Sequence, residues 1–170
     1  MKKIILGIAV LFSFAANAQV TKVSLQASGL TCSMCSNAIN KALKTLDFVA
    51  KVEANIKNSS FDIYFKPGAS IDLDKLKDKV EGAGFAVASF IVTVHFDNVA
   101  VVNDNHVTVG NTVYHFLNIK DQQLNGDKAI RLLDKGFVSA KEYKKNSIYT
   151  KMECYKTGVD AGKRIFHVTI

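Results

Sequence analysis

The sequence has 170 residues, with 22 lysines and arginines against 15 aspartates and glutamates, and its formal net charge is +7. Because the lysines are scattered along the chain, this mild excess is typical of a solvated surface and does not indicate a nucleic-acid partner. Only three cysteines are present, so the chain is not one of the small secreted proteins that disulfides hold together.

Residues 1–18 have the three parts of a secretory signal peptide. Two lysines follow Met1, an apolar run covers 4–14, and positions 16–18 read Ala-Asn-Ala, with small residues where a signal peptidase cleaves. The apolar run is shorter than the roughly 20 residues that cross a bilayer. We therefore expect a periplasmic or secreted protein that has no stable membrane insertion after cleavage.

The segment 19–90 alternates between two kinds of pattern. Apolar and polar residues alternate at 23–27, 52–56, 61–65 and 86–90, which predicts four strands. Helical spacing predicts a helix at 35–46 and a second at 73–83, the latter capped by Asp72 and ended by Gly82 and Gly84. The order β-α-β-β-α-β predicts an α+β, ferredoxin-like domain with both helices on one face of an antiparallel sheet.

The segment 91–170 is rich in β-forming residues and follows without a flexible linker, so we expect a rigid junction near residues 89–91. A helix is predicted around Ala129, Leu132 and Leu133, with Asn125 or Asp127 as its cap and Gly136 as its end. Strands are predicted at 91–96, 99–102, 107–109, 112–117, 148–155 and 165–170. This order predicts a small OB-like barrel with its helix between the third and fourth strands.

Cys32 and Cys35 carry the clearest chemistry in the chain. They lie as Cys-x-x-Cys at the junction of the first predicted strand and helix, where free amide groups and the helix dipole favour thiolates. Thiolates are soft ligands that select Cu(I), Zn(II) and related ions. A structural zinc site needs four ligands, and no neighbouring His or Cys completes such a set. Two sulfurs suit the low coordination number of Cu(I), so the pattern predicts an open site from which a partner's thiol can take the ion.

The stretch Gly29-Leu30-Thr31-Cys32-Ser33-Met34-Cys35 resembles the Gly-Met-Thr-Cys-x-x-Cys motif of the heavy-metal-associated domain family, which includes copper chaperones, metal-pumping ATPases and periplasmic mercury-binding proteins. Residues 49–55, 63–67 and 81–85 are similar to other parts of the family pattern, so the resemblance covers about residues 20–90.

The resemblance implies sequestration or transfer of Cu(I), with a metal-transporting ATPase as a possible donor or acceptor. Leu30 stands where the family usually has a buried Met that packs and does not bind metal, and Leu preserves its volume. The resemblance also implies that Phe85 lies close to the metal loop, either as a wall that limits access or as ordinary core packing. Met34 is expected to point to solvent.

Three other functions stay open. The same cysteines are also compatible with mercury or zinc, or with thiol–disulfide exchange in an oxidoreductase. A thioredoxin-type site needs a Pro facing the cysteines, however, and the single proline, Pro67, falls at a strand end. The third alternative is an interaction protein in which residues 91–170 matter most. Because no paired carboxylates, nucleophile–His pattern or phosphate-binding loop is present in the sequence, we do not expect an enzyme.

The third cysteine, Cys154, falls in a predicted strand with Met152, and the four histidines fall singly in predicted strands. We therefore expect Cys154 to be a small buried hydrophobic residue and the histidines to lie on strand faces or the surface. A second copper site would require the fold to bring a histidine such as His95 or His115 to Cys154.

Overall fold

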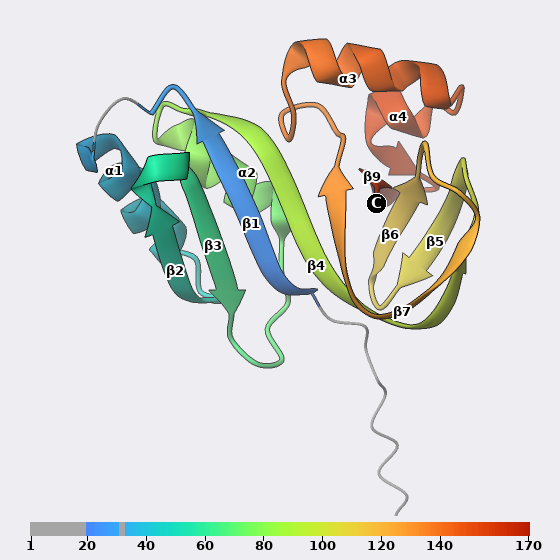
Figure 1. Cartoon of the computed structure of the whole chain (residues 1–170), viewed down its shortest axis with the longest axis horizontal. Helices are drawn as coiled ribbons and strands as arrows, with labels where there is room; N and C mark the ends of the chain where they lie inside the picture. Colours follow the sequence, from blue (N-terminus) through green and yellow to red (C-terminus); the bar gives the residue numbers. More distant parts are fainter. Residues whose placement is uncertain (1–19, 31–32) are drawn as a thin grey trace, which may run out of the picture.

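The computed structural model describes residues 20–30 and 33–170, and its N-terminal half has the predicted ferredoxin-like order (Figure 1). The strands lie in the order β2-β3-β1-β4 with antiparallel neighbours, and both helices lie behind this sheet in the view of Figure 1. The predicted α+β, βαββαβ arrangement is therefore confirmed. Its elements are β1 (Val20–Ser28), α1 (Ser33–Lys44), β2 (Val49–Asn55), the 3₁₀ turn η1 (Ile56–Asn58), β3 (Ser60–Phe65), α2 (Leu73–Gly82) and the first part of β4 (Ala86–Val101).

The helices of this half form where the sequence predicts them. Asp72 caps α2, because its side chain accepts a hydrogen bond of 3.1 Å from the Lys75 amide. Gly84 has a φ of +88°, a left-handed conformation that lets the chain turn from α2 into β4. The helices bury their apolar stripes against the sheet, and the fully buried members are Ile39, Leu43, Leu76 and Val80.

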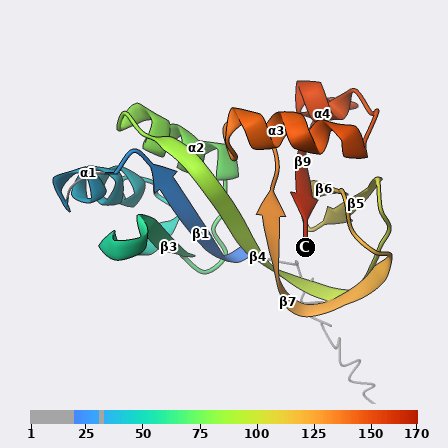
Figure 2. The same ribbon diagram turned by 45° about the horizontal axis from the view of Figure 1, so that its top comes forward.

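Strand β4 belongs to both halves of the chain. Its residues 86–94 pair with β1, and its residues 91–101 pair with β7 (Gln122–Leu132). Residues 90 and 91 lie inside this strand, and Figure 2 shows β4 continuing from one half into the other. The two strands predicted at 91–96 and 99–102 are one strand, interrupted only by a register shift between Phe96 and Val99 where Asn98 has a φ of +47°.

The C-terminal half is a curled sheet with two short helices at one end (Figure 1). Its strands lie in the order β4-β7-β9-β6-β5, and β6 and β9 are parallel. Strand β5 is the last in this order, so the described ladders form an open sheet. Besides β7, the elements are β5 (Asn105–Val109), β6 (Thr112–Phe116), α3 (Ala140–Asn146), the 3₁₀ turn η2 (Ser147–Tyr149), α4 (Cys154–Thr157), β8 (Val159–Asp160) and β9 (Lys163–Thr169).

Two predictions for this half are wrong. The predicted helix around Ala129 is the end of β7, in which Ile130 and Leu132 are buried while Arg131 between them is partly exposed. This alternation of buried and exposed side chains is that of a strand paired with β4. The pairing with β4 overrides the helical spacing of the apolar residues. The predicted strand at 148–155 is instead η2 and α4. As a result, the helices follow β7, the fourth strand of this half, and do not lie between the third and fourth strands.

One buried cluster connects the two halves. It extends from Val23 in β1 to Val168 in β9. Within it the Phe137 ring makes T-shaped contacts with Phe90, at 4.9 Å between centroids, and with Phe166, at 6.1 Å. None of the helices in the described part of the chain has the length and apolar character needed to span a bilayer.

Candidate metal centres

Cys35 is the member of the predicted metal-binding pair that the structure describes. Cys32 and the preceding Thr31 lie outside the described residues. Cys35 is half-buried in the first turn of α1, and that turn contains no acidic residue. The positive end of the helix dipole therefore favours a thiolate at Cys35, as a soft metal ion requires.

Leu30 and Met34 lie as predicted. Leu30 is partly buried against the core, which agrees with a packing role below the loop. The Met34 side chain is 80% exposed. Phe85 also packs partly buried against the core, so packing is the role that its observed contacts support.

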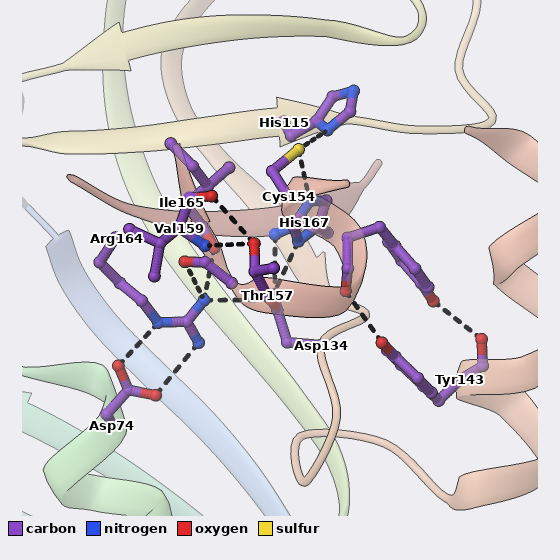
Figure 3. Close-up of polar contacts among 12 residues, drawn as sticks. Asp74, His115, Asp134, Tyr143, Cys154, Thr157, Val159, Arg164, Ile165 and His167 are labelled. Carbon is purple, nitrogen blue, oxygen red and sulfur yellow. Dashed lines mark hydrogen bonds and ion pairs between the residues drawn. The ribbon is translucent and has the colours of Figure 1, made fainter. Parts of the chain in front are cut away.

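A second group of metal-binding side chains lies at the other end of the molecule. The sulfur of Cys154, at the start of α4, lies 3.4 Å from Nε2 of His106, 3.6 Å from Nδ1 of His115 and 3.5 Å from Nε2 of His167. Figure 3 shows Cys154 between His115 and His167. Cys154 is 5% exposed and both of these histidines are fully buried, whereas 26% of the His106 side chain is exposed.

The strand register brings the three histidines together. His106 on β5 is directly opposite His115 on β6, and His115 is directly opposite His167 on β9. Side chains at paired positions lie on the same face of a sheet. The three imidazoles therefore form a row across three strands, and α4 places Cys154 over that row.

Each imidazole of this row has a carboxylate at its other ring nitrogen. Asp104 lies 3.0 Å from Nε2 of His115, and Asp134 lies 3.0 Å from Nδ1 of His167. The contact of His106 is looser, with 3.6 Å between its Nδ1 and Asp160.

Asp134 is itself held by several donors. It accepts a hydrogen bond of 2.8 Å from the His167 amide and one of 3.2 Å from Arg164. Arg164 also donates two hydrogen bonds, of 2.9 and 3.1 Å, to the Asp74 carboxylate on α2 (Figure 3). The histidine row is therefore linked to the N-terminal half through Arg164.

Burial disfavours the charged forms of His115 and Cys154. It lowers the pKa of His115 to about 4, and repulsion from charged forms of His167 and His106 acts in the same direction. Burial raises the pKa of the Cys154 thiol, and the negative charge of Asp160 adds to this effect. A thiol with a raised pKa is a poor nucleophile, so the arrangement does not resemble an activated catalytic cysteine.

The expectation that the histidines lie singly is therefore wrong for three of the four. His95 does lie apart, exposed and 2.7 Å from Asp127. Cys154 is buried as expected, but in a helix and among imidazoles. The sequence contained the ligand types but no local spacing that predicts the group, because its members come from four separate elements.

Comparison with known protein families identifies the segment that contains the first of the two candidate centres. Residues 24–86 match the model of the heavy-metal-associated domain. These residues form a heavy-metal-associated domain. The result confirms the resemblance found for about residues 20–90, and the match ends before the residues of the histidine row.

The similar proteins match the same part of the chain. A copper-transporting ATPase of Helicobacter pylori is 34% identical over 65 residues, which are 38% of this chain and 9% of the ATPase. The copper chaperone CopZ of Staphylococcus aureus is 27% identical over 63 residues, which are 37% of this chain and 91% of the chaperone. Among solved structures, a copper-binding domain from a P-type ATPase is 30% identical, with a TM-score of 0.36, and the match covers 39% of this chain and 89% of that domain. The chain thus spans less than a tenth of the ATPases that it matches.

Proposed function

We propose that this protein is an exported metal carrier that sequesters or passes on Cu(I) through Cys32 and Cys35. The observation that supports this most is the heavy-metal-associated domain at residues 24–86, with the Cys-x-x-Cys motif at its first loop and helix. Two thiolates form a soft, low-coordinate site, and the position of Cys35 in the first turn of α1 favours the thiolate.

The proposed partners are proteins that exchange Cu(I) through thiols. The similar proteins include copper chaperones and copper-transporting ATPases, and a partner's thiol can enter an open two-coordinate site as a third ligand. The proposed location is the periplasm or the exterior of the cell, on the basis of the signal-peptide pattern at residues 1–18. In an oxidising compartment the two cysteines must be kept reduced, or be reduced by a partner, before they bind Cu(I).

The test is an anaerobic titration of the reduced full chain with Cu(I) against a competing chelator. We expect the Cys32→Ser/Cys35→Ser double variant to bind one equivalent of Cu(I) fewer than the native chain. Met34→Leu is the matched control, because it changes the exposed residue between the cysteines and should retain that equivalent. Stronger competition by Hg(II) or Zn(II) would assign the site to another metal. Absence of Cu(I) binding, together with turnover of a disulfide substrate, would instead identify an oxidoreductase.

A further inference from the structure

We propose that Cys154, His106, His115 and His167 form a second metal site, which binds a borderline-soft transition-metal ion of the zinc and copper class. The ligand atoms of Cys154, His106 and His115 all lie within 4.8 Å of one another, and His167 approaches the same sulfur at 3.5 Å. The site lies outside the heavy-metal-associated domain and does not depend on the function proposed for that domain.

The hydrogen bonds of the buried histidines favour a cation at the centre of the group. A carboxylate only accepts hydrogen bonds, so the ring nitrogens that face Asp104 and Asp134 carry the protons of His115 and His167. The other nitrogen of each ring then presents a lone pair to Cys154. A thiol has one proton and can satisfy one lone pair at a time. At least one fully buried imidazole acceptor is therefore left without a donor from this group, which is costly unless a cation occupies the centre.

The three sulfur–nitrogen distances match those between sulfur and nitrogen ligands of a tetrahedral metal ion. With metal–sulfur bonds near 2.3 Å and metal–nitrogen bonds near 2.0–2.1 Å, sulfur and nitrogen ligands lie about 3.5 Å apart. The three observed sulfur–nitrogen distances are 3.4, 3.6 and 3.5 Å. One thiolate and three neutral imidazoles are ligands that zinc and copper accept, whereas hard cations such as Mg²⁺ prefer oxygen.

The surrounding carboxylates are placed as in established metal sites. A metal-bound histidine typically donates its other N–H to a carboxylate, which fixes the ring and makes it a stronger ligand. Asp104 and Asp134 accept such hydrogen bonds from His115 and His167, and Asp160 lies at the outer nitrogen of His106. His106 is the partly exposed member of the group, so its side of the cluster offers a route for the ion.

The experiment uses the full chain with Cys32→Ser/Cys35→Ser, so that the thiols of the first centre are absent. Co²⁺ is the probe, because a tetrahedral site with a thiolate gives intense visible bands and a sulfur-to-cobalt charge-transfer band. We expect one equivalent of Co²⁺, displaced by one equivalent of Zn²⁺. Competition between zinc and copper salts for the same site then shows which ion it prefers. A folded protein without these bands would overturn the proposal.

Two variants in the same background assign the ligands. His106→Ala removes the most exposed ligand and should lower the Co²⁺ affinity by about tenfold or more, and Asp104→Asn should lower it by about 10–100-fold. Far-UV circular dichroism checks that both remain folded. The matched control is His95→Ala, which removes an exposed histidine outside the cluster and should leave the affinity unchanged. Equal loss in His95→Ala and His106→Ala would contradict the assignment. With Cys32 and Cys35 intact, His106→Ala should still bind Cu(I) at the first centre, so the two proposals can fail separately.

Discussion

Cys154 is a buried thiol whose surroundings suppress its reactivity while offering ligands for a metal. Its sulfur faces three imidazole nitrogens, but burial raises its pKa, so the thiolate is scarce unless a cation replaces the proton. Cys35 is more accessible, at the start of a helix. The two described cysteines therefore lie in two different environments, one near the surface and one inside the fold.

The first prediction follows from this contrast in accessibility. In the folded, metal-free protein, iodoacetamide at neutral pH should leave Cys154 unmodified, because the side chain is 5% exposed and the reactive thiolate is disfavoured. Peptide mass spectrometry with and without denaturant measures the labelling of each cysteine. Labelling of Cys154 in the native protein as fast as after unfolding would contradict the structure.

The second prediction concerns pH and the metal-free protein. The pKa of His115 is about 4 when folded, against an ordinary value of 6.5, and the groups around it are Asp104, His106, His167 and Cys154. Between these two pKa values the unfolded state binds more protons, so the free energy of unfolding rises with pH. Stability should therefore fall as the pH drops from about 6.5 towards 4, by up to a few kcal/mol.

Urea unfolding with EDTA at a series of pH values measures this dependence. His115→Asn should weaken it, because the titrating group is removed from the buried row. His95→Asn serves as the control, since this exposed histidine lies apart from the cluster. A His115→Asn variant with an unchanged pH dependence would show that other groups cause it.

At the scale of elements, Arg164 on β9 joins the sheet of the C-terminal half to α2. It forms two hydrogen bonds to Asp74, one to Asp134, and lies over the Phe166 ring at 4.2 Å. A planar guanidinium can make these contacts together, whereas a lysine ammonium cannot reproduce the paired geometry. The contact therefore positions α2 and also holds the carboxylate that orients His167.

The third prediction is that Arg164→Lys lowers the free energy of unfolding by about 1–2 kcal/mol, because hydrogen bonds to partly buried carboxylates are lost. Chemical denaturation measures the change. Lys163→Ala is the matched control, since Lys163 is an exposed cation on the same strand and should change stability by less than about 0.5 kcal/mol. Equal stability of Arg164→Lys and the native protein would mean that the contact contributes little.

The elements differ in how well their sequence predicts them. In the N-terminal half, strand alternation, the helical stripes and the Asp72 cap are local signals that agree with the tertiary structure. At the end of β7, the spacing of Ala129, Leu132 and Leu133 is typical of a helix, but the segment forms a strand because it pairs with β4. The Cys-x-x-Cys motif near Cys35 is likewise a local pattern, so the first centre could be proposed from the sequence alone.

The histidine row depended on long-range pairing that no local pattern contains. His106 and His115 face each other across a hairpin, but His167 joins them only through the parallel pairing of β6 with β9. Residues 148–155, predicted as a strand, instead form the turn and helix that bring Cys154 to the row. The strand predicted for this segment gave no reason to expect the Cys154 sulfur beside the three histidines.

At the scale of the whole molecule, the two halves share a strand and a core, which should make their unfolding cooperative. Strand β4 pairs with β1 and with β7, and Phe137 packs between Phe90 and Phe166. The loss of either half would expose a β4 edge and this aromatic contact to water. We therefore expect amides of β1 and β9 to become exposed to exchange in one unfolding event.

The fourth prediction tests this coupling with Phe137→Ala. The ring is fully buried, so its removal should lower the free energy of unfolding by about 3–5 kcal/mol through lost burial and a cavity. Hydrogen exchange should show the same loss of protection in β1 and in β9, although Phe137 lies outside both strands. Ile148→Ala is the control, because that side chain is 76% exposed. If protection fell only in the C-terminal half, the N-terminal half would be an independent folding unit despite the shared strand.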